Sequence, residues 1–185
     1  MNISILRFAA AFGLVALPSC VSATGITYDC DTASGHFSEL ILPAPGNRFT
    51  VTGNLQLNAI APVDKYAPLA RLQIASESEP GQSPTLFAGF TLTALPVDAK
   101  KNPTGQPVIE MLAFNVNGKD DDVLPSSMIV KPGTVVPFVV SFDGSNVSVK
   151  LNDATRLFPL GTTQPVVRLV CSTGEFLFTN LAIKQ

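Results

Sequence analysis

The chain has 185 residues, of which 46% are hydrophobic and only 14% are charged, and its formal net charge is −2. It has no basic stripe of the kind that binds phosphate backbones, so nucleic acid is not expected as a partner. A disordered chain would carry less Val, Leu, Ile and Phe, and the low charge is typical of exported β-proteins.

The first residues combine a basic start, an apolar run of about ten residues and small residues up to Ala23, a pattern typical of a secretory signal peptide. We therefore expect residues 1–23 to be a signal peptide and residues 24–185 to form one secreted or periplasmic domain. The apolar run is too short to span a bilayer, and no later stretch is long enough. The segment Leu17–Cys20 also resembles a bacterial lipobox, so a lipid anchor on Cys20 is the alternative.

Alternating hydrophobic residues predict short strands along most of the mature chain. In chain order, the clearest cover residues 49–58, 86–94, 108–116, 136–142, 147–151, 166–171 and 176–183. We expect a bulge at Gly53, a hairpin turn over Asp143–Asn146 and a connection between the two closing strands over Ser172–Gly174. Recurring prolines keep the strands short, and nothing indicates a helix. The pattern predicts an all-β fold, a two-sheet antiparallel β-sandwich.

Two cysteines remain once the signal peptide is set aside, Cys30 near the start of the mature chain and Cys171 near its end. In an oxidising compartment they are expected to form one disulfide. Closing so long a loop would restrict the unfolded chain by about 4–5 kcal/mol in the entropic account. The bond would tie the first strand to one of the last.

Two segments resemble a known family. Residues 137–152 are similar to the penultimate hairpin of concanavalin A-like or laminin-G-like jelly rolls, in which a strand leads through an Asp-Gly turn into a second strand that ends near an Asn turn. Residues 174–183 resemble their last strand. The resemblance implies a jelly-roll sandwich and is compatible with a role in binding a glycan or a surface polymer.

An oxygen-rich segment is the candidate metal site. Calcium takes six to eight oxygen ligands, which side chains around Gly118 could supply in part. Many laminin-G-like domains bind calcium at a loop rim, which the resemblance extends to this segment. The other interpretation is a solvated hairpin turn. The candidate calcium ligands are Asn115, Asn117, Asp120 and Asp122.

Sugar-binding sandwiches commonly present aromatic side chains as stacking platforms. The chain has no Trp and two Tyr, and Tyr66 in a polar loop is the candidate ligand-binding residue.

Catalytic motifs are scarce. Glu110 shares an apolar strand face with Leu112 and Phe114, where burial would raise its pKa. The chain has one histidine, His36, and no Gly-x-Ser-x-Gly motif that would provide a serine nucleophile for it to activate. No pair of acidic residues has the spacing of the two catalytic carboxylates of a glycosidase. We assign no catalytic residue and predict that the chain is not an enzyme, a hydrolase being the minor alternative. The expected function is a binding or adhesion module for a glycan. The alternative is a structural or assembly subunit of the cell envelope, with an envelope protein as partner.

Overall fold

The structure, a computed structural model, describes residues 25–63, 65–78, 81–96, 107–117, 119–120, 129–130 and 133–185. These residues form eleven strands and no helix, which confirms the all-β prediction. Residues 1–23, which are predicted to be a signal peptide, lie outside the described residues, and so does Cys20. The strands are β1 (Ile26–Pro43), β2 (Phe49–Ile60), β3 (Leu69–Ser76), β4 (Phe87–Pro96), β5 (Pro107–Val116), β6 (Lys119–Asp120), β7 (Ile129–Val130), β8 (Val136–Phe142), β9 (Asn146–Leu151), β10 (Ala154–Pro159) and β11 (Pro165–Lys184).

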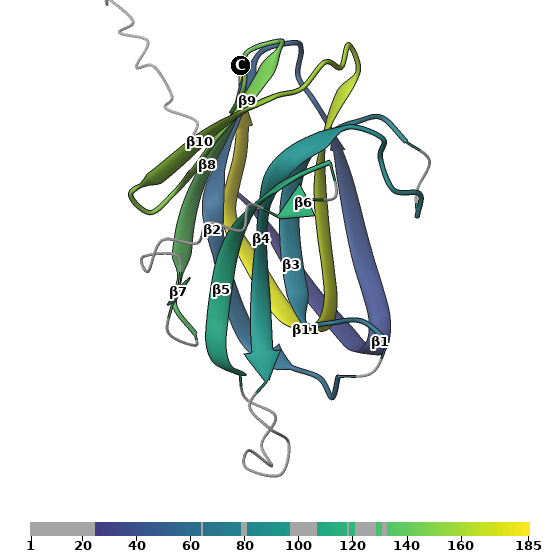
Figure 1. Ribbon diagram of the computed structural model, residues 1–185, viewed down its shortest axis with the longest axis vertical. Helices are drawn as coiled ribbons and strands as arrows, with labels where there is room; N and C mark the ends of the chain where they lie inside the picture. The colour runs from purple at the N-terminus through teal and green to yellow at the C-terminus, as the bar shows by residue number, and fades with distance from the viewer. Residues whose placement is uncertain are drawn as a thin grey trace, which may run out of the picture.

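The strands pair antiparallel in two layers that share β1 and β11 (Figure 1). In sheet one, the order β10–β9–β8–β2 continues into the second half of β11 and the first half of β1. In sheet two, the order β5–β4–β3 continues into the first half of β11 and the second half of β1. The short strands β6 and β7 both pair with β5. The predicted two-sheet antiparallel sandwich is confirmed.

Strand β11 changes sheet in its middle, where Thr173 has a φ of 54°. It pairs with β3 up to Ser172 and with β2 from Gly174 onward. The prediction of two closing strands joined by a connection at 172–174 is therefore wrong. One left-handed residue bends a strand without reversing it, so the chain continues into the other layer.

Strand β1 bends at the same level, between Thr32 and Phe37, and Figure 1 shows both bends near the lower end of the view. The Thr32 hydroxyl donates a hydrogen bond to the Gly174 carbonyl at 2.9 Å. This contact ties the two bends together.

The core between the layers is built from the inward residues that the period-2 pattern selects. A row of rings crosses it: Phe138 of sheet one lies 5.2 Å from Phe90 of sheet two and 6.5 Å from Phe178, measured between centroids. Gly53 faces this core and pairs regularly with Phe138, whose ring would lie 2.8 Å from a Cβ at that position. The predicted bulge is therefore not formed by Gly53 itself. The extra residue lies opposite, in β11, where Asn180 has a φ of 54°.

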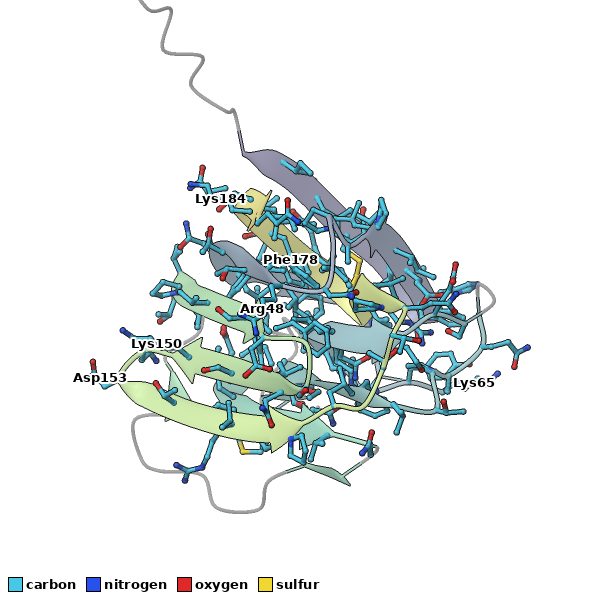
Figure 2. The ribbon with its side chains drawn as sticks, turned by 90° about the horizontal axis from the view of Figure 1, so that it is seen from above. Arg48, Lys65, Lys150, Asp153, Phe178 and Lys184 are labelled. Atoms are coloured by element: carbon cyan, nitrogen blue, oxygen red, sulfur yellow. A yellow bond between two sulfur atoms is a disulfide. The ribbon has the colours of Figure 1, made fainter. Side chains whose placement is uncertain are left out.

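The disulfide Cys30–Cys171 joins β1 to β11 beside the bends, with a Cα separation of 6.4 Å (Figure 2). Both cysteines are buried. The predicted pairing is confirmed, and it crosslinks the two strands that the layers share.

Candidate functional site

Sheet two carries polar side chains on the side that points away from the core, and most of them are buried there. Residues that face each other in neighbouring antiparallel strands lie on the same side of a sheet, so the register orders these side chains in rows. One row runs from Arg168 through Gln73 and Gly89 to Asn115, and the next runs from Val170 through Arg71 and Thr91 to Ala113. We call the polar members of these rows, together with Glu39 of β1, the polar face: Glu39, Arg71, Gln73, Thr91, Asn115 and Arg168.

The amides of Gln73 and Asn115 are linked across the sheet. Gln73 Nε2 donates to Asn115 Oδ1 at 2.9 Å, although the two residues belong to β3 and β5 and Gly89 of β4 lies between them. A Cβ at Gly89 would lie 2.0 Å from the Leu72 carbonyl oxygen. Glycine therefore lets β4 approach β3 closely, and its missing side chain leaves the path between the two amides open.

Arg168 and Glu39 form an ion pair at the β11–β1 end of the face, where their side chains are 9% and 10% exposed. Glu39 Oε2 also accepts a hydrogen bond from the Gly81 amide at 3.0 Å, which holds the loop before β4. Buried charges are tolerated when they are paired and hydrogen-bonded in this way. The pair neutralises the charge of Arg168.

Arg71 and Thr91 have polar atoms without a hydrogen-bond partner among the described residues. They face each other across β3 and β4, and both Arg71 Nε and Thr91 Oγ1 are buried and unpaired. Thr91 is only 2% exposed, whereas Arg71 is partly exposed. A buried polar atom without a partner costs about 1–3 kcal/mol. An acceptor supplied by a ligand would remove this cost for Arg71, and a guanidinium favours carboxylates.

Two of the predicted calcium ligands, Asn115 and Asp120, are partners in the register of β5 and β6, and of these two only the Asn115 side chain is among those that the structure describes. Asn115 accepts from Gln73, and Asn117, with a φ of 45°, accepts from the Phe87 amide at 2.9 Å and shapes the end of β5. The Asp120 side chain and Asp122 lie outside the described residues. No group of three metal-binding His, Cys, Asp or Glu side chains occurs in the described part of the chain. Calcium binding stays a prediction.

Tyr66 lies in the loop between β2 and β3, beside the bend of β11. Its carbonyl accepts from the Thr173 hydroxyl at 2.8 Å, and the next carbonyl, of Ala67, accepts from the Ser172 hydroxyl at 2.6 Å. The Tyr66 ring meets the ring of Phe37 in a T-shaped contact with centroids 5.9 Å apart. The predicted ligand-binding residue is thus fixed at one end of the polar face.

Glu110 lies in the core and not on the polar face. It pairs with Ala94, has no exposed surface and accepts from the Gly133 amide at 2.8 Å. Burial raises the pKa of this carboxyl, and the hydrogen bond from Gly133 acts in the opposite direction. Glu110 is thus buried on the apolar side of its strand, which places the carboxyl away from a surface ligand. His36 is exposed, with Nδ1 2.8 Å from the Ser34 carbonyl oxygen.

Sheet one has a shallow hollow of about 280 Å³ on its own outer surface, around Arg48, Thr50 and Asp143. Its polar groups are largely paired with one another. The Thr50 and Ser141 hydroxyls lie 3.0 Å apart, and hydrogen bonds from the Ser145 and Asn146 amides lower the pKa of Asp143. None of the described residues around this hollow has a buried polar atom without a partner, in contrast to Arg71 and Thr91.

The sequence interpretation missed Glu39, Arg71, Gln73 and Arg168. The signal available was parity: Arg71 and Gln73 alternate with Leu72 and Ile74, which are core residues. Polar residues at the outward positions of a central strand indicate a surface that has a role besides solubility. The sequence of one strand does not show which other strands lie next to it.

No family model matches this chain, and no curated protein matches it. Solved structures do share its fold. An alginate lyase, PA1167 from Pseudomonas aeruginosa, is 14% identical over 80% of this chain and 74% of that chain, with a TM-score of 0.51. The polysaccharide lyase family 18 protein aly-SJ02 r-CATD is 9% identical over 89% of each chain, with a TM-score of 0.50. The carbohydrate-binding module CBM66 from Bacillus subtilis is 10% identical over 80% of this chain and 82% of that chain, with a TM-score of 0.45.

At such identities the similarity establishes the fold alone, a jelly-roll β-sandwich. It also shows that the prediction of no enzymatic activity is wrong, because lyases are among the structures that share this fold. That prediction rested on missing hydrolase motifs. A lyase cleaves by elimination and needs none of them.

The described residues contain no helix with the length and hydropathy needed to cross a membrane. The disulfide is a bond that persists in oxidising compartments and is compatible with secretion.

Proposed function

We propose that the polar face binds an anionic polysaccharide, one built from uronate sugars, outside the cell. The observation that carries the proposal is the facing pair of Arg71 and Thr91, whose buried Nε and Oγ1 have no partner in the part of the chain that the structure describes. A carboxylate against the guanidinium and a sugar hydroxyl against Thr91 would satisfy both atoms.

The choice of an anionic glycan follows from the charges on the face. Glu39 neutralises Arg168, so Arg71 is the cation that the described part of the face leaves without an ion pair. The linked amides of Gln73 and Asn115 lie beside it and supply neutral hydrogen-bonding groups that suit hydroxyls. Support for a polysaccharide also comes from the shared fold, since two of the structures that have it are named as an alginate lyase and a polysaccharide lyase.

Binding of alginate, measured by calorimetry at low salt, tests the proposal, with the neutral polymer dextran as comparison. We expect the chain to bind alginate and not dextran, and its affinity for alginate should fall as the salt concentration rises. Arg71→Gln should weaken binding by about tenfold or more, because a charge-assisted contact is lost. Lys150→Gln, on the outer surface of sheet one, is the matched control and should leave affinity unchanged; Lys150 lies across the molecule from Lys65 in Figure 2.

Thr91→Val separates binding from stability. It removes a buried hydroxyl that has no partner, so the variant should be at least as stable as the original chain while it binds alginate more weakly. Equal weakening by Arg71→Gln and Lys150→Gln would overturn the proposal. Absence of any glycan binding, together with self-association in light scattering, would favour the envelope-subunit alternative.

A second candidate is a lyase that acts on the same polymer. In an elimination, a base takes the proton next to the carboxylate, the electrons form a carbon–carbon double bond, the glycosidic C–O bond breaks, and the leaving oxygen takes up a proton. Arg71 could neutralise the carboxylate and so make that proton easier to remove. The shared lyase fold favours this candidate.

Incubation with alginate, followed by ultraviolet absorbance of the unsaturated product, tests the lyase candidate. The lyase candidate would be supported if the original chain forms the unsaturated product and the Arg71→Gln variant forms none while it still binds alginate measurably. Stable alginate in the presence of a chain that binds it would overturn the lyase candidate and leave the binding proposal standing.

A further inference from the structure

Phe37 is an exposed aromatic side chain at one end of the polar face. It is 50% exposed although it belongs to β1, and it pairs with Ser172 of β11, which in turn pairs with Leu69 of β3. Leu69 is two residues before Arg71 on the same strand. Strand spacing and rise place Phe37 about 12 Å from Arg71 on the same side of the sheet.

The neighbours of Phe37 hold it in place. Its ring contacts the ring of Tyr66 in a T-shaped arrangement, and the Lys65 ammonium lies 5.0 Å from the Tyr66 ring centroid. The loop that carries Tyr66 is fixed to the bend of β11 by the hydroxyls of Ser172 and Thr173, and by a hydrogen bond from the Ala61 amide to the Thr173 carbonyl. An aromatic group on a fixed support loses little freedom when it binds a ligand.

We propose that Phe37 and Lys65 form a second sugar subsite, in which a uronate ring packs on Phe37 and its carboxylate meets Lys65. Tyr66 supports the subsite, since the Lys65 ammonium lies against its ring, whereas Phe37 has the larger exposed surface. The apolar C–H face of a sugar packs on an aromatic ring, and the adjacent cation selects an anionic sugar. The inference rests on the proposed function, because a chain bound at Arg71 and extended toward β1 would reach this subsite.

Length dependence tests the subsite. Affinity for alginate oligomers of increasing length should rise in a step when an oligomer becomes long enough to span Arg71 and Phe37. Phe37→Ala should remove this step, about threefold to tenfold in affinity, and leave the shortest binding oligomer unaffected. Phe37→Trp should restore the step. Lys65→Gln should reduce the size of this step in affinity for alginate oligomers.

Leu157→Ala is the matched control, because Leu157 is 64% exposed on β10 of sheet one. It should leave the step in place. A step of equal size in the original chain and in Phe37→Ala would overturn the subsite while binding at Arg71 stands. Binding of every oligomer length that is weaker by about tenfold or more in Arg71→Gln is the separate result that the proposed function requires. If the original chain binds no alginate oligomer, both proposals are overturned.

Discussion

The hydrogen bond between Gln73 and Asn115 joins two strands by passing over a third. Its 2.9 Å length depends on Gly89, the residue between them, which has no side chain to stand in the way. The polar face is therefore organised by a residue that itself offers no polar group.

Replacement of this glycine should damage stability and binding together. In Gly89→Ala, the new methyl group would clash with the Leu72 carbonyl and separate β3 from β4. We expect a loss of about 1–3 kcal/mol in the free energy of unfolding, measured by urea denaturation, and weaker alginate binding. Gly161→Ala, where a Cβ meets nothing within 4 Å, is the control. Equal stability of the two variants would contradict the account of Gly89.

The Arg168–Glu39 pair should show strong coupling. Glu39→Gln leaves Arg168 buried beside a neutral partner and should destabilise the fold by about 3–5 kcal/mol. The double variant Glu39→Leu/Arg168→Met removes both charges and should recover most of this loss. Thermal and denaturant unfolding of Glu39→Leu, Arg168→Met and the double variant measures the coupling. Additive losses would mean that the two side chains act independently.

Glu110 should make the fold less stable as the pH rises. Its pKa is raised in the folded state, so folding retains the proton at pH values where the unfolded chain, with a pKa near 4.5, has lost it. The contribution of the protonated carboxyl is complete below that pH and declines as the pH rises through the folded-state pKa. Glu110→Gln keeps an acceptor for the Gly133 amide and should flatten this decline. Urea midpoints at several pH values measure it; parallel pH profiles of the two proteins would contradict the assignment.

The disulfide should contribute most of its effect through the unfolded chain. Cys30→Ala/Cys171→Ala should lower the free energy of unfolding by up to about 4–5 kcal/mol, because the crosslink closes a loop across 141 positions. A reductant should lower the unfolding midpoint of the original chain and leave that of the double variant unchanged. An unchanged midpoint in the original chain would contradict this contribution.

Much of the fold was predictable because strand alternation is a local property. The hairpin around Asp143, the disulfide and the sandwich follow from parity, turn residues and cysteine count. The sequence did not predict that β11 is one bent strand. A connection between two strands and a left-handed bend at Thr173 use similar residues, and only the strands that pair with each half of β11 distinguish them.

The candidate site was harder to predict for the same reason. Arg71, Thr91 and Arg168 come from three strands, and only the register places them on one surface. Asn115 was noticed for its oxygen, but its partner Gln73 lies 42 positions away in the chain. The exposure of Phe37 could not be predicted, because a single phenylalanine in a sequence does not show whether its ring is buried or exposed.

Strand β11 lies next to β3 in one sheet and next to β2 in the other, and it follows both of them in the sequence. Neither layer can complete its pairing before β11 exists, and such long-range contacts make folding slow. A chain emerging from the ribosome therefore holds β1 to β10 without the strand that joins them. Assembly of the sandwich is a late, all-at-once event, and deletion of the last twenty residues should leave no folded remnant of either sheet.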